Sequence, residues 1–363
     1  MKKRYLALLL FYFGLVFGQN IPNSFAIDAN YFTGNILKHA PDLGPLITGH
    51  PEGFLVSFSK KTYGNEEWER VYNYPDFGVY LLYQDFKNQY LGSTYAVGLH
   101  YNFYFLNRKL VFKISDGIAM VSNPHDNEFN NKNIAFGSKF LGNVNLGLNY
   151  KTKIIDHLSL QSGFMFTHFS NARIKSPNRG INTFNVNLGL TYDFDKNANQ
   201  IKDTTTLSMK FKEPVKYNFV IRTGNNESTV VGSGIYPFYH IGFYADKRLN
   251  RKSALQFGTE LFLTKSIVDF IKYQSIGYPE LNLDPNTDYK RVGIFIGHEL
   301  FINRISLETQ IGYYVYKPFK YDTALYDRLG MKYYISNKFY TELAIKTHGF
   351  LAEALEFGVG VRL

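Results

Sequence analysis

The sequence predicts an all-β fold, an antiparallel transmembrane β-barrel of about 14–16 strands. Three observations support this class. Apolar and polar residues alternate with a period of two along most of the chain, an export signal precedes them, and the last alternating segment, 354–363, runs to the final residue. A water-soluble β-sandwich alternates in the same way, but we favour the barrel because the three features occur together.

Residues 1–18 have the pattern of a signal peptide. A basic start at 2–4 precedes an apolar run over 5–17, and Val16 and Gly18 place the cleavage site before Gln19. That run of 13 residues is too short for a spanning helix, which needs about 20. No other segment approaches such a length, so a helical membrane protein is excluded and the mature chain, 19–363, is expected to cross with strands.

The composition agrees with a barrel and excludes some chemistry. Aromatic residues make up 17% of the chain, with 29 Tyr and 33 Phe, a mixture that suits strands and interfacial girdles. There is no cysteine, so disulfides and thiol chemistry are excluded. The net charge of +10, part of which leaves with the signal, suits an anionic partner such as a phosphorylated lipid but does not identify one. No nucleic-acid partner is expected.

Alternation defines the individual strands. From 134 to 150 one face is mainly apolar, whereas the other is small or rich in amides. Similar segments recur along the chain, and the candidate strands are 24–33, 53–61, 76–86, 91–105, 109–119, 134–150, 157–170, 181–194, 215–224, 234–245, 253–264, 290–301, 304–316, 328–336, 339–348 and 354–363.

The lengths of the connections provide a check on this topology. If the first strand leaves the periplasm, connections after odd strands are extracellular and are expected to be longer, as most are. Two periplasmic connections, 62–75 and 195–214, are longer than this scheme expects. The polar segment 195–214 is the one plausible internal boundary, dividing 19–195 from 196–363. The chain is then one wide barrel, or an eight-stranded unit followed by a second β unit, and we favour one barrel.

One cluster of polar residues breaks the apolar outer face. His168 and Ser170 share that face of the strand 157–170, and Asn182 takes the corresponding position on the returning strand. Polar side chains toward lipid cost stability, so the cluster suggests a function. The alternative is a polar rim in which Asn, Pro and Gly residues close the turn.

These side chains are suited to acyl transfer to water. Ser170 needs a base to remove its proton, and histidine is the side chain whose pKa suits that task. Asn182 would hold the imidazole in the useful tautomer, and Asn171 with nearby backbone N–H groups would stabilise an oxyanion. The G-x-S-x-G, H-E-x-x-H and phosphate-loop motifs are absent, and the histidines lack metal-ligand spacing, so we expect neither a metal nor a cofactor.

The motif His168-x-Ser170-Asn171-Ala172, followed by Pro177-Asn178-x-Gly180, resembles the signature of the lipid A 3-O-deacylase (PagL-like) family, also called acyloxyacyl hydrolases. Trp68 and the segment 75–79 are also similar. The resemblance covers roughly 20–195. It implies an eight-stranded outer-membrane barrel that removes the ester-linked acyl chain at position 3 of lipid A in lipopolysaccharide, without a cofactor.

By this resemblance Ser170 is the nucleophile, His168 the base, and Asn171 and Arg173 the oxyanion contributors. Two positions depart from the family pattern, because Asn182 stands where the family has an acid and Arg173 where it usually has glycine. Either the amide of Asn182 suffices, or a carboxylate such as Asp126 or Glu128 arrives from the loop 120–133, or the activity is weak.

Two further expectations concern charge. Arg173, Lys175 and Arg179 lie in the turn between the two catalytic strands and suggest contact with lipid A phosphates, although a solvated loop explains them as well. The alternative to an enzyme is a non-catalytic channel or structural barrel, in which lumen-side charges would line or plug a pore. These charged residues are Glu260, Glu299, Glu308, Glu342, Lys346 and Arg362. The sequence leaves the oligomeric state open.

Overall fold

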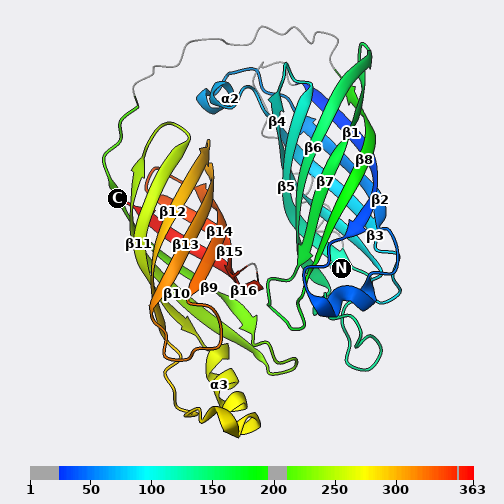
Figure 1. The fold of residues 1–363 in the computed structure, drawn as a ribbon. Coiled ribbons are helices and arrows are strands. Elements are labelled where there is room, and N and C mark those ends of the chain that lie inside the picture. The colour runs from blue at the N-terminus through cyan, green and yellow to red at the C-terminus, as the bar shows by residue number, and fades with distance from the viewer. Residues whose placement is uncertain (1–23, 195–210, 350) are drawn as a thin grey trace, which may run out of the picture.

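The computed structural model describes residues 24–194, 211–349 and 351–363, so the predicted signal peptide lies outside the described residues. Sixteen antiparallel strands form two closed barrels of eight strands each (Figure 1). The first comprises β1 (Phe25–Ile36), β2 (Glu52–Lys60), β3 (Asp76–Asp85), β4 (Ser93–Phe105), β5 (Leu110–Val121), β6 (Phe140–Ile155), β7 (Leu158–Ser170) and β8 (Ile181–Asp193). The second comprises β9 (Lys216–Glu227), β10 (Ile235–Arg248), β11 (Ser253–Thr264), β12 (Arg291–Ile302), β13 (Ile305–Tyr316), β14 (Leu325–Tyr334), β15 (Phe339–His348) and β16 (Leu351–Arg362).

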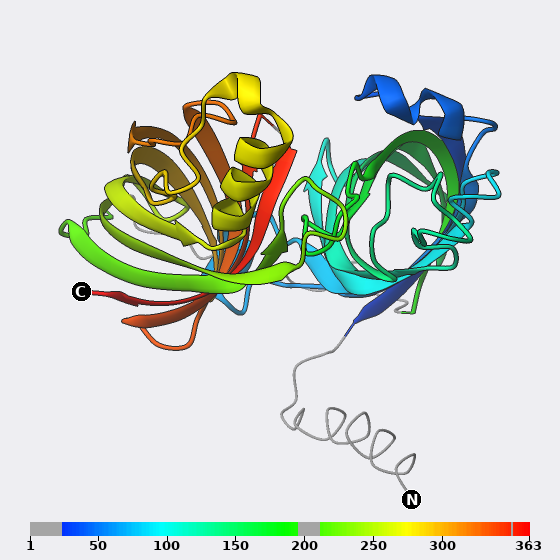
Figure 2. The same cartoon turned by 90° about the horizontal axis from the view of Figure 1, so that it is seen from below.

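The predicted all-β antiparallel class and the number of strands are confirmed, but the single wide barrel that we favoured is wrong. β1 pairs with β8 and β9 pairs with β16, so each set of eight strands closes on itself. Seen from below, the two barrels stand side by side (Figure 2). Closure of either ring removes its unpaired edges, and the period-two alternation is the same in one ring or two. The sequence pattern therefore could not distinguish these arrangements.

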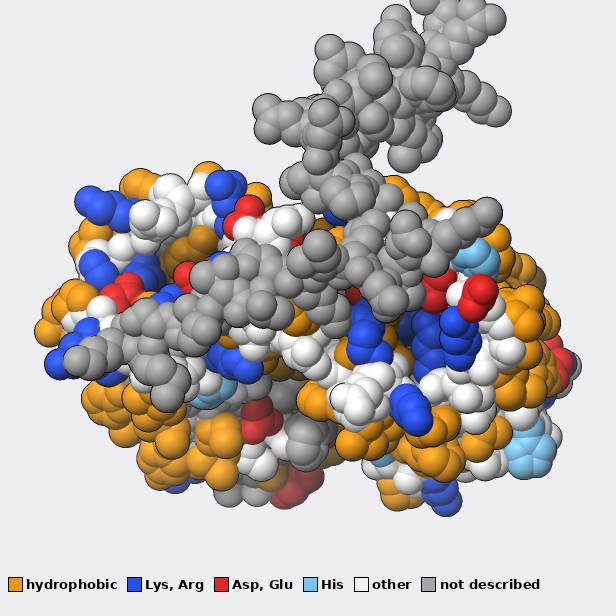
Figure 3. All heavy atoms as spheres, turned by 90° about the horizontal axis from the view of Figure 1, so that it is seen from above, with side chains coloured by type: hydrophobic (Ala, Val, Ile, Leu, Met, Phe, Trp, Pro, Cys, Tyr) orange, Lys and Arg blue, Asp and Glu red, His pale blue; other side chains and the backbone are white. Residues whose placement is uncertain are grey.

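Each barrel carries its own apolar outer face. Side chains such as Leu81 and Ile118 in barrel one, and Ile296 and Val359 in barrel two, are 61–65% exposed. In the view from above, hydrophobic side chains lie around the outlines of both barrels, and Lys and Arg side chains lie on the end that faces the viewer (Figure 3). Within the described residues no helix is long and apolar enough to cross a membrane.

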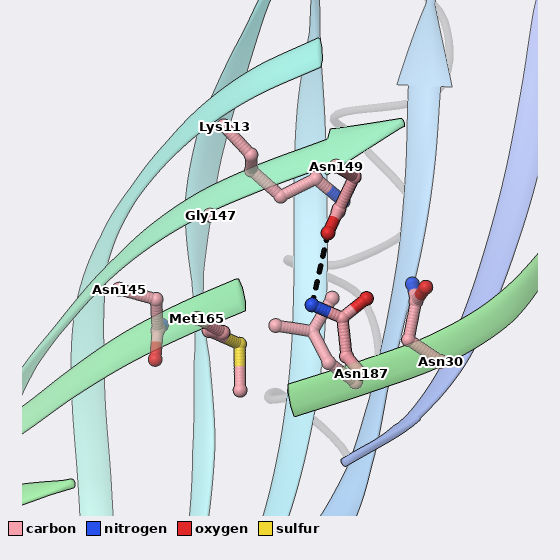
Figure 4. Close-up of a pocket in the computed structure, with 8 residues that line it drawn as sticks. Asn30, Lys113, Asn145, Gly147, Asn149, Met165 and Asn187 are labelled. Carbon is pink, nitrogen blue, oxygen red and sulfur yellow. Dashed lines mark hydrogen bonds between the residues drawn. The ribbon is translucent and has the colours of Figure 1, made fainter. Parts of the chain in front are cut away.

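Amide side chains and a small ionic cluster fill the lumen of barrel one. Lys113 Nζ lies 2.8 Å from both Asp28 Oδ1 and Ser57 Oγ, and Asn187 donates to Asn149 Oδ1 at 2.9 Å. Figure 4 shows this Asn pair beside the small cavity that the lumen retains. The amide-rich strand face seen in the sequence is thus the inner face of the barrel.

Barrel two is filled by a buried network of ion pairs. Arg222 donates to Glu260 at 2.6 Å and to Glu342 at 3.0 Å, and Arg328 donates to Glu356 at 2.6 Å. The six charged residues predicted to face the lumen are all buried in this barrel. A buried charge is tolerated only where it is paired, and these pairs cross the lumen between strands that are far apart in the sequence.

Long connections gather at one end of both barrels, which we call the loop end, and short ones at the other, the turn end. The loop end carries η1 (Pro41–Leu46), α3 (Ser266–Gly277) and η2 (Pro279–Leu281), with α3 lying at the loop end of barrel two (Figure 2). At the turn end, the short helix α2 (Glu67–Val71) accounts for the long connection 62–75. The other long connection, 195–214, joins the two barrels, and its residues 195–210 lie outside the described chain.

One predicted strand boundary is wrong in a way that matters for the site. Residues 134–139 were expected to begin a strand, but β6 starts at Phe140. Asn133 Oδ1 instead accepts the N–H groups of Ala135 and Phe136 at 3.0 and 3.1 Å, which bends the segment into a loop. Its carbonyl groups then accept hydrogen bonds from 179–180, in the connection between β7 and β8.

Candidate active site

His168, Ser170 and Asn182 lie on one outer face near the loop end, as the strand parity predicts. β7 and β8 are neighbours, and His168 stands directly opposite Asn182. The same face carries the exposed rings of Phe164 and Phe184, which stack with their centroids 5.6 Å apart. The polar cluster therefore interrupts an apolar surface at the end of two strands.

A chain of hydrogen bonds fixes the tautomer of His168. His168 Nδ1 lies 2.6 Å from Asn182 Oδ1, and because an amide oxygen only accepts, Nδ1 carries the proton. Asn182 Nδ2 in turn lies 3.3 Å from His39 Nδ1, and His39 Nε2 lies 3.0 Å from the carbonyl oxygen of Arg179. His39 Nδ1 also lies 3.2 Å from the carbonyl oxygen of Leu37, so each ring nitrogen of His39 faces a backbone acceptor. In this arrangement Nε2 of His168 keeps its lone pair, as a general base requires.

The Ser170 hydroxyl is held by the turn that follows it. Asn178 Nδ2 and the Ala172 N–H donate to Ser170 Oγ at 2.9 and 3.0 Å, and Ser170 is only 7% exposed. Among the described residues, no hydrogen bond joins Ser170 Oγ to the imidazole of His168. A Cβ on Gly180 would lie 3.4 Å from both His168 Cε1 and Ser170 Cβ, so this glycine separates the two side chains without filling the space between them.

Asn171, one of the two predicted oxyanion contributors, makes hydrogen bonds within the turn. The N–H of Asn171 donates to Asn178 Oδ1 at 2.9 Å, and its side-chain amide donates to the Lys175 carbonyl oxygen at 2.8 Å. Both donors of Asn171 are thus engaged within the turn. The donors beside Ser170 Oγ are the Ala172 N–H and the Asn178 amide.

Two consecutive residues of this turn, Ala172 and Arg173, have left-handed backbone conformations with φ of 53° and 61°. Glycine adopts this region most readily, and other residues do so at a cost. The backbone at Arg173 therefore keeps the conformation favoured by glycine although the residue is arginine.

The three cations of the turn do not form one cluster. Arg179 pairs with Asp42 at 2.8 Å, Lys175 is exposed, and the side chain of Arg173 lines a small cavity against barrel two. Contact of these residues with a phosphate stays a prediction.

In the loop 120–133, the carboxylate of Asp126 is engaged elsewhere. Asp126 Oδ1 accepts the N–H groups of Phe129 and Glu128, both at 2.9 Å, and these bonds hold the pKa of Asp126 below its usual range. Within the described residues neither carboxylate contacts His168, and no group of three or more His, Asp or Glu could hold a metal ion. Asn182 is the residue that contacts the imidazole.

Sequence reasoning assigned no role in the chemistry to Asn178 and overlooked His39. Asn178 lies within the motif, but it was attributed to turn closure alone. Its place in the motif is the signal that could have indicated its contact with Ser170. His39 belongs to the connection 37–51, whose path over the end of β8 depends on a backbone hydrogen bond from Leu37 N–H to the Asn182 carbonyl oxygen. No periodicity in the sequence reports such a contact.

The turn also rests on the preceding loop at Gly137. A Cβ there would lie 2.5 Å from the carbonyl oxygens of both Lys175 and Pro177, so any side chain would displace the turn. We expect Gly137→Ala to lower kcat by about 10- to 100-fold, because a shift of about 1 Å misaligns reacting groups. Gly147→Ala is the matched control, since its nearest neighbour would be 3.6 Å away. Equal ester turnover by the two variants would contradict this role for Gly137.

Two family models match the sequence. Residues 52–191 match lipid A 3-O-deacylase (PagL), and residues 215–363 match the acyloxyacyl hydrolase C-terminal domain. The chain carries a PagL domain followed by an acyloxyacyl hydrolase C-terminal domain. The two matches correspond to barrel one and barrel two, and the PagL match contains His168, Ser170 and Asn182.

No curated protein matches this chain. Among solved structures, Neisserial surface protein A is 13% identical with a TM-score of 0.29, covering 47% of this chain and 97% of its own. OccAB3 of Acinetobacter baumannii is 11% identical with a TM-score of 0.22, covering 94% and 98%. Scores this low support no argument about function.

Proposed function

We propose that barrel one is an outer-membrane serine esterase that removes an ester-linked acyl chain, at the 3-O position, from lipid A. Ser170 is the nucleophile, His168 the general base and Asn182 the residue that orients the imidazole. The 2.6 Å contact between His168 Nδ1 and Asn182 Oδ1 carries the proposal, because it leaves Nε2 free to accept a proton.

The reaction begins when the Ser170 hydroxyl rotates from Asn178 toward His168. Oγ attacks the ester carbonyl while Nε2 takes the hydroxyl proton, and the Ala172 N–H and Asn178 amide donate to the developing oxyanion. Collapse breaks the ester C–O bond, and the imidazolium returns the proton to the departing sugar hydroxyl. Water then repeats these steps on the acyl-enzyme, releasing the fatty acid and restoring Ser170.

The location of the site favours a lipid substrate. It opens on the outer face among exposed aromatic rings rather than into a lumen. Gly142 stands opposite Ser170 on β6, and a Cβ there would meet only the Ser170 carbonyl oxygen, at 3.5 Å. The surface beside the nucleophile is therefore open where hydrocarbon would lie. With the loop end facing outward, the site reaches the outer leaflet, where lipopolysaccharide resides.

The channel alternative has little physical support. Eight strands enclose a lumen just wide enough for side chains. Paired charges fill barrel two, and amides with the Lys113–Asp28 pair fill barrel one.

Mass spectrometry of lipid A from cells with and without the protein tests the proposal. The expected result is the loss of one primary 3-O acyl chain when the protein is present. Loss of a secondary chain would contradict the 3-O assignment, and unchanged lipid A would contradict the esterase. Cells that produce the Ser170→Ala variant provide the matched control.

The cations of the turn predict a preference for phosphorylated lipid. Replacing Arg173, Lys175 and Arg179 together with glutamine is expected to raise KM for phosphorylated lipid A by about tenfold, and less for a dephosphorylated analogue. Lys153→Gln, at the turn end, is the control. Equal effects on both substrates would argue against phosphate recognition.

A further inference from the structure

Barrel two contacts the turn that follows the nucleophile. Glu227, the last residue of β9, accepts the Ser176 N–H at 2.6 Å through its carboxylate and donates its own N–H to the Arg173 carbonyl oxygen at 3.2 Å. The Ser176 hydroxyl also donates to the Ser228 carbonyl oxygen at 2.6 Å. All of these bonds involve buried residues of barrel two, with Glu227 only 3% exposed and Ser228 7%.

Arg173 and Ser176, the two residues of the turn that bond to Glu227, lie close in sequence to the two donors that hold Ser170. Arg173 directly follows Ala172, whose N–H donates to Ser170 Oγ, and Ser176 precedes Asn178 by two residues. Because Ala172 and Arg173 are both left-handed, this segment has a backbone conformation that its residues do not favour. The bonds from Glu227 therefore restrain a strained segment at the points where its movement would displace both donors.

The Glu227 carboxylate is itself fixed within barrel two. Its second oxygen accepts the N–H of Gly234 at 3.3 Å, which ties the residue to the connection between β9 and β10. The neighbouring Asn226 makes its contacts inside barrel two, donating to the Glu353 carbonyl oxygen at 3.0 Å and accepting from Ser266 Oγ at 2.9 Å. Of these two adjacent residues, Glu227 bonds to the turn, whereas the side-chain hydrogen bonds of Asn226 stay within barrel two.

We propose that Glu227 is a positioning residue for ester hydrolysis, through which barrel two holds the turn 171–178 in its reactive conformation. This inference rests on the proposed function of barrel one. Glu227 contacts no reacting atom, and its effect is transmitted through the placement of Ala172 and Asn178.

Glu227→Ala leaves the buried Ser176 N–H without its acceptor and is expected to lower kcat by about 10- to 100-fold, with KM changed less than threefold. Glu227→Gln keeps one carbonyl acceptor and is expected to stay within about threefold of the wild type. Asn226→Ala, the matched control, disturbs the same end of barrel two without touching the turn, and its kcat is expected to be unchanged.

Hydrogen exchange of the amides in 171–180, measured on the full-length protein in detergent, supplies a readout that does not depend on activity. Exchange is expected to accelerate in Glu227→Ala but not in Asn226→Ala. Wild-type kcat in a folded Glu227→Ala variant, or equal losses in the Ala variants at 226 and 227, would overturn the inference. If Glu227→Ala fails to fold, a Glu227→Gln variant with slow turnover and unchanged exchange overturns it. Absence of wild-type hydrolysis contradicts the proposed function instead, whereas the exchange comparison still tests the restraint.

Discussion

Ser170→Ala is expected to abolish ester hydrolysis, with turnover falling by about 10⁴-fold or more, because no neighbouring group can replace the attacking oxygen. His168→Ala is expected to cause a loss of similar size, since the serine proton then has no acceptor. The two losses should not add when the substitutions are combined, because nucleophile and base act as a unit. Turnover of purified lipid A by protein in detergent micelles measures all three variants.

Folding is the necessary control for these variants. Ser170 and His168 lie at the end of β7, where their side chains form hydrogen bonds with the turn and with Asn182. Each variant is therefore expected to remain a folded, heat-modifiable barrel on gel electrophoresis. Wild-type turnover by folded Ser170→Ala would show that the nucleophile is assigned wrongly.

Asn182→Ala is expected to reduce turnover by about 10²- to 10⁴-fold, because the imidazole loses the acceptor that keeps its proton on Nδ1. Asn182→Glu should keep or increase activity, since a carboxylate orients the ring and also stabilises the imidazolium formed during attack. Turnover of a single ester substrate by the two variants is the measurement.

The loop carboxylates provide the opposing test. Asp126→Asn and Glu128→Gln are expected to be nearly silent, because Asp126 accepts backbone N–H groups of its own loop. If these variants are damaging while Asn182→Ala is silent, a loop carboxylate orients His168. If all four variants match the wild type, the triad does not exist.

The strands could be predicted from sequence because successive side chains of a half-buried strand point to opposite faces, so apolar and polar residues alternate. The same rule located the lumen charges of barrel two, such as Glu260 and Glu308, before their partners were known. Ring closure could not be predicted in this way. The pairing of β1 with β8 depends on strand order and curvature, and neither changes the alternation.

The candidate active site likewise contains residues that strand parity predicts and residues that it does not. Strand parity was sufficient to bring His168, Ser170 and Asn182 to one face. His39 and Glu227 reach the site from distant parts of the chain. His39 is separated from Asn182 by 143 positions in the sequence, and Ser176 from Glu227 by 51. Such contacts depend on tertiary paths that no local spacing encodes.

The two closed rings have a consequence for biogenesis. β16 seals only barrel two, whereas barrel one is sealed by β8, an internal strand after which the chain continues into barrel two. If the barrels form in chain order during membrane insertion, barrel one closes while the strands of barrel two are still unpaired. Barrel one is complete at an internal strand, so its closure has to be recognised from the hydrogen-bonding seam between β1 and β8 itself.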